Sequence, residues 1–214
     1  GGGKYEQFQK QFISKFRCPP ALLRNLFLFP TDSTSFYRYQ DGWKNVYRLE
    51  LSIAQRKRII IAFERVFKEL NYKQPKKTYG DIIEDRGTQV SFSPYGQEIV
   101  STLGAKGIAI KAVWGATPWR ARIAKRLEKY LPEFEVRCGG LTTIDVTRKG
   151  IDKAYGLRQI QKHLKIPICE MLFIGDAIFS GGNDYAVTKT KVHYIKVSGP
   201  SETEKIIQQI LAAG

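Results

Sequence analysis

Apolar side chains recur at helical spacing in three stretches of the first two thirds of the chain. Aromatic residues three or four positions apart predict a helix over residues 4–16, which Pro19 and Pro20 would end. The same spacing predicts helices over 52–70, with Ser52 as the N-cap, and over 118–130.

Short apolar or alternating runs between these helices predict strands. Asp41-Gly42 separates two such runs and favours a hairpin, because the dipeptide accepts the positive φ values of a tight turn. The strands and helices do not alternate regularly, which is typical of an α+β module. The predicted strands cover residues 26–29, 36–39, 46–49, 89–92, 133–137 and 141–146.

The pattern changes after residue 150. A predicted helix over 151–164 is followed by apolar strands over 171–174 and 193–197 and a helix over 202–211. Continuously apolar strands between helices are typical of a doubly wound parallel sheet. We therefore predict an α/β fold: a Rossmann-like core over 1–49 and 145–214, with an inserted α+β cap over 50–144.

Composition narrows the class of protein. The 214 residues are 43% hydrophobic and contain no apolar run long enough for a membrane helix, and the three cysteines are scattered. We therefore predict a cytoplasmic, soluble protein. The net charge of +15 fits either nucleic acid or an anionic small substrate; scattered cations without interleaved aromatic residues favour the small substrate.

One motif points to chemistry. The apolar strand at 171–174 leads to Gly175-Asp176, and Gly181-Gly182 then returns the chain to Asn183-Asp184. Acids at the carboxyl end of such a strand suit Mg²⁺, which prefers oxygen ligands. The alternative is an ordinary glycine-rich turn. Lys153 begins a helix, where the dipole disfavours a cation, so an anionic neighbour such as a transferring phosphate would explain it.

The combination of Gly139-Gly140 through Val146, Gly150 through Lys153 and the Gly175–Asp184 motif resembles one branch of the haloacid-dehalogenase superfamily. This cap-bearing branch contains the eukaryotic phosphomannomutases and related sugar phosphatases. Asp85-Arg86-Gly87 and Ser93 through Gln97 resemble its cap.

The resemblance implies roles for individual residues. Lys153 would stabilise charge, Asp176 and Asp184 would hold Mg²⁺, and Asn183 with Asp184 would order the phosphate and the metal-bound water. In the cap, Arg86, Gln97, Thr143 and Asp145 would contact a sugar phosphate. For Arg86 the alternative is a turn residue paired with Asp85, and for Thr143 a strand residue facing solvent.

Two departures from the family pattern shape the predicted function. The chain has no Asp-x-Asp step, so we expect an N-terminally truncated fragment, inactive alone, whose nucleophile and first core strands lie upstream. Gln97 replaces an arginine that the mutases use for a second phosphate, which favours a sugar phosphatase. The alternatives are a phosphomannomutase, or a non-catalytic binder of sugar phosphate or nucleic acid. A homodimer through the cap is also expected.

Overall fold

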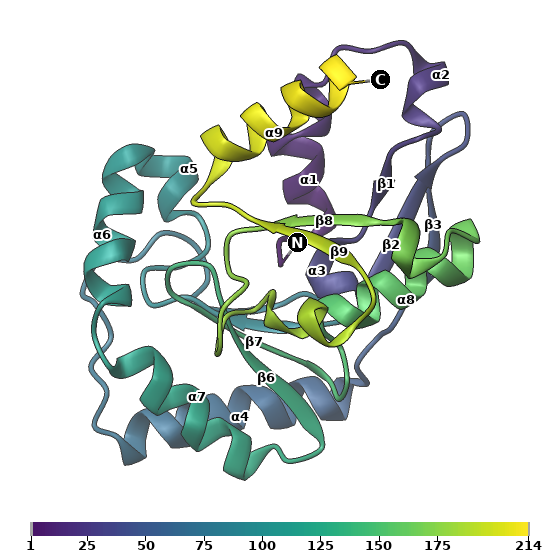
Figure 1. The fold of residues 1–214 in the computed structure, drawn as a ribbon. Helices are drawn as coiled ribbons and strands as arrows, with labels where there is room; N and C mark the ends of the chain where they lie inside the picture. The colour runs from purple at the N-terminus through teal and green to yellow at the C-terminus, as the bar shows by residue number, and fades with distance from the viewer. Residues whose placement is uncertain (1, 214) are drawn as a thin grey trace. The chain divides into compact units, whose positions relative to one another are not determined.

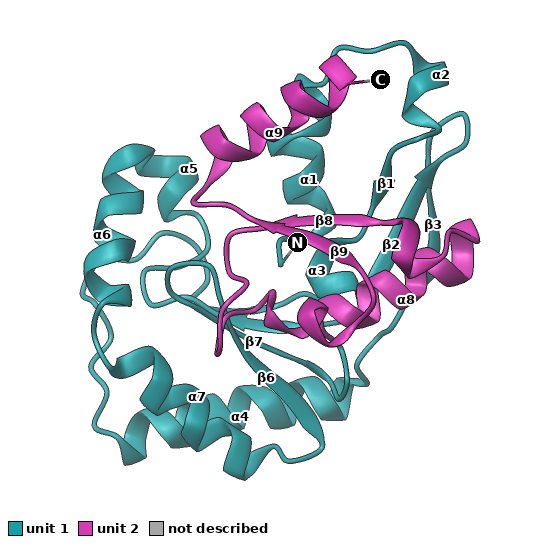
Figure 2. Ribbon diagram, in the orientation of Figure 1, with its two compact units in different colours: residues 1–151 teal, residues 152–214 magenta. Residues whose placement is uncertain are grey.

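The computed structural model describes residues 2–213, and the chain divides after Ile151 into two compact units (Figure 2). Figure 1 labels the elements of both units. Within residues 2–213, no helix combines the length and the apolar character needed to cross a membrane.

The first unit begins with short elements and an antiparallel sheet of order β1-β2-β3. The predicted hairpin is confirmed: β2 and β3 pair antiparallel, and Asp41 and Gly42 have φ values of 51° and 129°. The predicted helix over 4–16 is shorter than expected. The elements are α1 (Tyr5–Gln11), η1 (Ile13–Lys15), α2 (Pro20–Leu23), β1 (Phe27–Leu28), α3 (Pro30–Ser33), β2 (Ser35–Tyr39) and β3 (Trp43–Arg48).

A four-stranded antiparallel sheet of order β4-β5-β7-β6 forms the rest of the first unit, with α4 and α7 packed together beneath it (Figure 1). Residues 99–115, for which the hydrophobic pattern predicts no element, form two helices. The elements are α4 (Ile53–Glu69), β4 (Ile83–Asp85), β5 (Val90–Phe92), α5 (Ile99–Leu103), α6 (Ala105–Gly115), α7 (Trp119–Tyr130), β6 (Phe134–Gly139) and β7 (Thr143–Arg148).

The helix α4 shows why this layer forms. Ser52 is its N-cap as predicted: the hydroxyl accepts from the Gln55 amide at 3.1 Å, and the Gln55 side chain accepts from the Ser52 amide at 2.8 Å. Ile59, Phe63 and Val66 recur on one face and are fully buried, so this face packs into the core cluster of the sheet.

The sheet has one apolar and one polar face. Strand alternation directs Val90 and Phe92 of β5 into the core and leaves Ser91 between them on the opposite face. The register extends this polar face across all four strands, because Ser91 pairs with Glu84 and with Asp145, and Asp145 pairs with Arg137.

The second unit is a parallel pair, β8 and β9, with helices before and after it. This confirms a mixed α/β fold that contains both parallel and antiparallel sheets. A small cluster around Leu157, Ile178, Val187 and Val192 packs α8 and η3 together. The elements are α8 (Lys153–Leu164), η2 (Ile168–Glu170), β8 (Leu172–Gly175), η3 (Tyr185–Lys189), β9 (His193–Lys196) and α9 (Pro200–Ala213).

The division into a core over 1–49 and 145–214 and a cap over 50–144 stays a prediction. The predicted boundary between residues 144 and 145 falls inside β7, which continues to Arg148. Because β7 pairs with both β5 and β6 along this length, a boundary that leaves the sheet whole lies beyond Arg148.

Candidate functional site

Two of the predicted acids meet at the carboxyl end of β8. Asp176 follows the strand directly and is exposed, whereas Asp184 returns from the glycine-rich turn and is buried, with 6% of its surface exposed. The Ala177 amide donates to Asp184 Oδ2 at 3.3 Å. Both residues line one cavity of about 610 Å³, so the structure brings this predicted pair together.

Gly175 explains how Asp184 reaches this position. A methyl group placed on Gly175 would lie 2.6 Å from Asp184 Oδ2 and 2.6 Å from the Phe173 ring. No side chain fits there without displacing the carboxylate, so the glycine before Asp176 allows the second acid to lie against the strand.

The donor set suits a hard cation. The cavity offers carboxylate oxygens from Asp176 and Asp184, and Glu204 of α9 also lines it. Mg²⁺ is commonly held by one or two carboxylates, with water and substrate phosphate completing its shell. Among residues 2–213 no three His, Cys, Asp or Glu side chains cluster closely enough to form a full protein cage. An open, oxygen-only site of this kind fits Mg²⁺.

Lys153 and Asn183 lie in the same unit but are not among the described residues that line this cavity. Lys153 is the first residue of α8, and Asp152 is its N-cap, accepting from the Tyr155 amide at 2.7 Å. This cap accounts for Asp152 without a catalytic role. Asn183 directly precedes Asp184 and is partly buried. The roles that the resemblance implies for Lys153 and Asn183 stay predictions.

Arg86 is held on the polar face of the first unit by three acceptors. Its side chain is only 4% exposed, and it bonds Glu84 Oε2 at 2.7 Å, the Gly2 carbonyl at 2.7 Å and Gln97 Oε1 at 3.0 Å. The structure therefore brings Arg86 and Gln97 together. The alternative partner was wrong: Arg86, which directly follows β4, pairs with Glu84, whereas Asp85 pairs with Arg56.

Glu84 is the anionic partner of two cations in this part of the molecule. Burial raises the pKa of its carboxyl, but hydrogen bonds and attraction from Lys4 and Arg86 outweigh burial and lower that pKa overall. The Lys4 ammonium lies 2.6 Å from Glu84 Oε1. Glu84 therefore stays ionised between two cations and fixes the position of Arg86.

Thr143 and Asp145 lie two apart on β7 and so share the polar face. Asp145 is buried, and the Ser91 hydroxyl donates to its Oδ1. Thr143 is partly buried rather than solvent-facing, and its hydroxyl donates to the Gly139 carbonyl at 2.6 Å. The absence of a side chain at Gly139 leaves room for both groups, since a methyl there would lie 2.6 Å from Asp145 Oδ2.

Three further polar residues lie near Asp145, and no sequence pattern indicated them. A methyl group on Gly2 would lie 3.5 Å from Asp32 Oδ2 and 3.7 Å from Asp145 Oδ2, so the two carboxylates face the same point. Gln89, fully buried, donates to Asp32 at 3.4 Å. Burial lowers the pKa of the Lys111 ammonium, while Asp145 acts to raise it.

The backbone around Asp32 explains why no pattern reveals it. Thr31, Asp32 and Ser33 have φ values of 49°, 54° and 72°, so three successive non-glycine residues adopt the left-handed conformation. This conformation costs energy for such residues and is often found at functional sites. Only the tolerance of Asp for it could have hinted at the turn.

Comparison with known proteins identifies relatives for most of the chain. The family model described as eukaryotic phosphomannomutase matches residues 27–213. A phosphomannomutase of Encephalitozoon cuniculi is 30% identical over 62% of this chain and 50% of its own length. A phosphomannomutase of Drosophila melanogaster is 34% identical over 43% of this chain and 37% of its own length.

A solved structure supports the fold. The N-terminally truncated, IMP-bound IMP-nucleotidase of Plasmodium falciparum superposes with a TM-score of 0.60 at 17% identity, over 97% of this chain and 52% of that one. The chain thus spans about half the length, or less, of the curated relatives it matches. Because the family model covers far more than half of its residues, the chain belongs to the eukaryotic phosphomannomutase family.

Proposed function

We propose that this chain forms the metal-binding and sugar-binding parts of a magnesium-dependent enzyme that transfers the phosphoryl group of a hexose phosphate. The observation that supports the proposal best is the pairing of Asp176 and Asp184 at one cavity beyond an apolar strand, in a chain of the phosphomannomutase family. Open α/β sheets bind their ligands at this end of a strand.

The second unit would supply the metal site. Asp176 and Asp184 would hold Mg²⁺, and the Ala177 amide keeps the Asp184 carboxylate oriented toward it. When bound, the ion neutralises charge on the phosphoryl group. Lys153 would add a cation for the same phosphate, and Asn183 would orient its oxygens. The nucleophilic and acid/base aspartates implied by the family resemblance would come from residues outside this chain, since it has no Asp-x-Asp step.

The first unit would recognise the sugar phosphate. Arg86 is already fixed by Glu84 and Gln97, so little conformational entropy is lost when it binds an anionic ligand. Asp145 and Thr143 would accept and donate hydrogen bonds to sugar hydroxyls. We propose no role for nucleic acid, because this polar face is lined by carboxylates as well as cations.

The phosphoryl group can be transferred back to the sugar or to water. The name of the curated relatives favours a mutase, which returns the phosphoryl group to the sugar. Gln97 favours hydrolysis, because a neutral amide holds a second phosphate less strongly than a guanidinium. Extending the chain to include an Asp-x-Asp segment and following hexose phosphates by phosphorus NMR would separate isomer formation from phosphate release.

Metal binding by the chain itself tests the central proposal. We expect Asp176→Asn and Asp184→Asn each to weaken Mn²⁺ binding by about tenfold or more, measured by electron paramagnetic resonance with Mg²⁺ as competitor. Gly175→Ala should weaken it as well, because the added methyl displaces Asp184.

Glu170→Gln provides the matched control. It removes one exposed carboxylate from the same unit but lies outside the cavity, so binding should be unchanged. Equal affinity in all four variants would contradict the proposed metal site. In the extended protein, phosphate transfer that persists in a chelator would contradict the magnesium-dependent function.

A further inference from the structure

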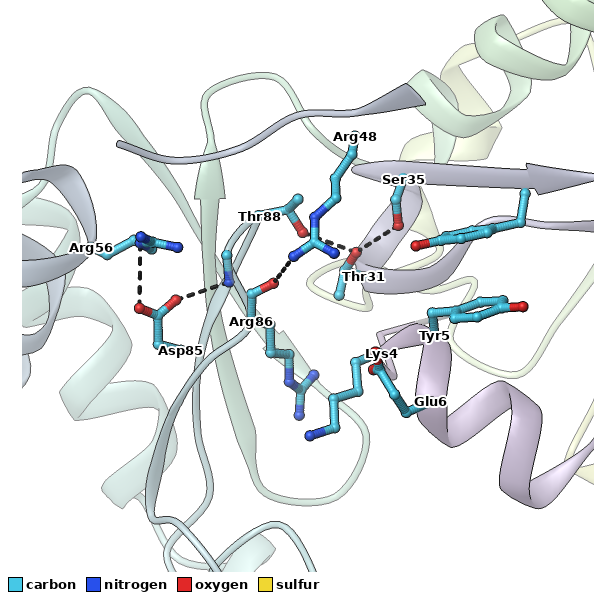
Figure 3. Close-up of a pocket in the computed structure, with 12 residues that line it drawn as sticks. Lys4, Tyr5, Glu6, Thr31, Ser35, Arg48, Arg56, Asp85, Arg86 and Thr88 are labelled. Carbon is cyan, nitrogen blue, oxygen red and sulfur yellow. Dashed lines mark hydrogen bonds and ion pairs between the residues drawn. The ribbon is translucent and has the colours of Figure 1, made fainter. Parts of the chain in front are cut away.

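A second cavity, separate from the two acids of the second unit, lies wholly within the first unit. It has a volume of about 360 Å³ and is lined by residues from α1, α3, β2, β3, α4 and β4 and from the turn after β4 (Figure 3). The cationic residues Lys4, Arg48 and Arg56 line it against two carboxylates, Glu6 and Asp85, and Arg86 also lines it although its guanidinium bonds Glu84, Gln97 and Gly2. The excess of positive charge favours an anionic ligand.

Arg48 lines this cavity, and its contacts within the protein use only some of its N–H donors. Its Nη2 donates to the Arg86 carbonyl at 3.1 Å, and it forms an ion pair with Glu50. That pair is about half exposed on both sides, at 43% and 51%, so solvent screens it and it contributes little. A guanidinium has five N–H donors, and an incoming oxyanion would be a stronger acceptor than a neutral carbonyl.

Arg56 is the least satisfied cation of the cavity. Its Nε is buried and lacks a partner with hydrogen-bond geometry, although Asp85 Oδ2 is 3.3 Å away. Its other carboxylate neighbour, Glu50, is 4.0 Å away and is shared with Arg48. The two carboxylates thus satisfy this guanidinium only in part, and an oxyanion in the cavity would supply a further acceptor for its other N–H groups.

Buried hydroxyls form the wall beside the guanidiniums. Thr31, Ser35 and Thr88 line the cavity and are at most 5% exposed. Thr34 links them, donating to Thr88 at 2.7 Å. Arg48, Thr31 and Thr88 all line this cavity (Figure 3). These hydroxyls also bond one another, since Thr88 donates to Thr31 at 3.2 Å and the Thr31 and Ser35 hydroxyls are 3.3 Å apart. A hydrogen turned toward an anion would exchange one of these bonds for a stronger one to a charged acceptor.

The rest of the cavity would accommodate an organic group. Tyr5 and Tyr37 stack with ring centroids 3.9 Å apart at one side of it. A volume of about 360 Å³ is within the ordinary range of small-ligand sites. Cations, hydroxyls and an aromatic wall together match a phosphorylated small molecule.

We propose that Arg48, Arg56 and the hydroxyls of Thr31, Ser35 and Thr88 form a binding site for the phosphate of a small metabolite. This site is distinct from the sugar-phosphate face around Arg86. Arg86 offers only its carbonyl to Arg48, while its guanidinium bonds Glu84, Gln97 and Gly2. Figure 3 shows the Arg86 side chain directed away from Arg48, alongside Lys4.

The test is a titration of the chain with inorganic phosphate and with a hexose monophosphate at constant ionic strength, followed by amide NMR. We expect the amides of Gly87 and Thr88 to shift with a saturating curve. Arg48→Gln and Arg56→Gln should each weaken binding by about tenfold, because each removes a charge-assisted donor.

Arg58→Gln is the matched control. Arg58 lies on α4, as Arg56 does, and its substitution removes the same charge. It pairs with exposed Glu133 at 2.5 Å and does not line the cavity. Its phosphate affinity should stay unchanged. Thr88→Val and Arg48→Lys provide milder changes if a glutamine variant fails to fold, which tryptophan fluorescence would reveal; each should weaken binding several-fold.

Three results would overturn the site: no saturating shift, an equal loss in the Arg58 variant, or shifts that follow Arg86→Gln instead of Arg48→Gln. The last result would assign phosphate to the sugar-phosphate face. Asp176→Asn should leave this binding intact. Failure of the metal site and failure of this cavity are therefore separate outcomes.

Discussion

The two units differ in how much apolar side chain stabilises them. In the first unit a single cluster of sixteen buried hydrophobic residues lies between the four-stranded sheet and the helices α4 and α7. In the second, the corresponding cluster has four, and α9 has no buried residue among those described. The first unit thus has a continuous core, whereas the second depends on a small number of contacts.

The difference in packing affects how firmly the side chains of the two polar sites are held in position. Glu84, which holds the Arg86 guanidinium, lies on β4 of a well-packed sheet, so the position of this ion pair is supported by the core beneath that sheet. Asp176 and Asp184 follow a two-stranded sheet with little packing, and Asp184 is positioned mainly by a backbone amide and by the space above Gly175. We expect the sugar-binding face to be rigid and the metal site to gain order when its ion binds.

The largest expected effect tests the two cores directly. Phe63→Ala removes a fully buried ring from the first unit and should cost about 3–5 kcal/mol of unfolding free energy. Leu157→Ala, the matched change in the second unit, should cost about 2 kcal/mol, because that side chain has fewer neighbours to lose. Urea unfolding would measure both.

The tryptophans make this comparison specific. Trp43, Trp114 and Trp119 all belong to the first unit, so fluorescence reports on that unit alone while circular dichroism reports on both. Phe63→Ala should shift the fluorescence transition, and Leu157→Ala only the circular dichroism signal. If Leu157→Ala shifts fluorescence equally, the two units unfold together and the comparison fails.

The elements that the sequence predicted are those whose local signals agree with one another. Over 52–70 the helical spacing, the Ser52 cap and the buried face all indicate one helix, and α4 follows within a residue at each end. The hairpin was predicted correctly because the turn dipeptide Asp41-Gly42 and the two flanking apolar runs indicate the same structure. In the second unit the two predicted strands do form the parallel pair β8 and β9, although β9 contains His193 and Lys196 and is exposed along its length.

The parts that were not predicted depend on contacts distant in sequence. The region 99–115 contains Gly104, Gly107 and Gly115, which weaken a helical signal, yet it folds into α5 and α6. The site around Asp145 also includes Asp32 and Gln89, which only tertiary structure brings near it. By contrast, Asp176 and Asp184 are eight residues apart on one turn, so a local motif could reveal them.

The next effect in size concerns acid stability of the first unit. Glu84→Gln should cost about 1–2 kcal/mol near neutral pH, because it leaves Arg86 and Lys4 with a neutral partner. The folded-state pKa of Glu84 lies below its ordinary value of 4.5, so its ionised form stabilises the fold above that pH. That stabilisation is lost as the pH falls through the folded-state pKa.

Urea titrations by tryptophan fluorescence at several pH values would measure this dependence. The difference between the unmodified chain and Glu84→Gln should be full above about pH 5 and should shrink as the medium becomes more acidic. Glu133→Gln, which breaks only an exposed pair, serves as the control. A difference that stays constant down to strong acid would show that Glu84 acts by shape and not by charge.

The smallest expected effect compares a helix cap in the first unit with one in the second. Ser52 caps α4 and Asp152 caps α8, and each side chain accepts one amide hydrogen bond, at 3.1 and 2.7 Å. Ser52→Ala and Asp152→Ala should each cost about 1 kcal/mol. Asp152 is also an anion at a helix N-terminus, so Asp152→Ala should cost more unfolding free energy than Ser52→Ala at low salt.

Loss of a cap should also fray the two helices to different extents, because α8 packs against a small core that compensates little for a frayed first turn. Amide hydrogen exchange should therefore show fraying spread through α8 after Asp152→Ala, but confined to the first turn of α4 after Ser52→Ala. Equal spreading in both helices would mean that core size does not govern how far a local defect extends.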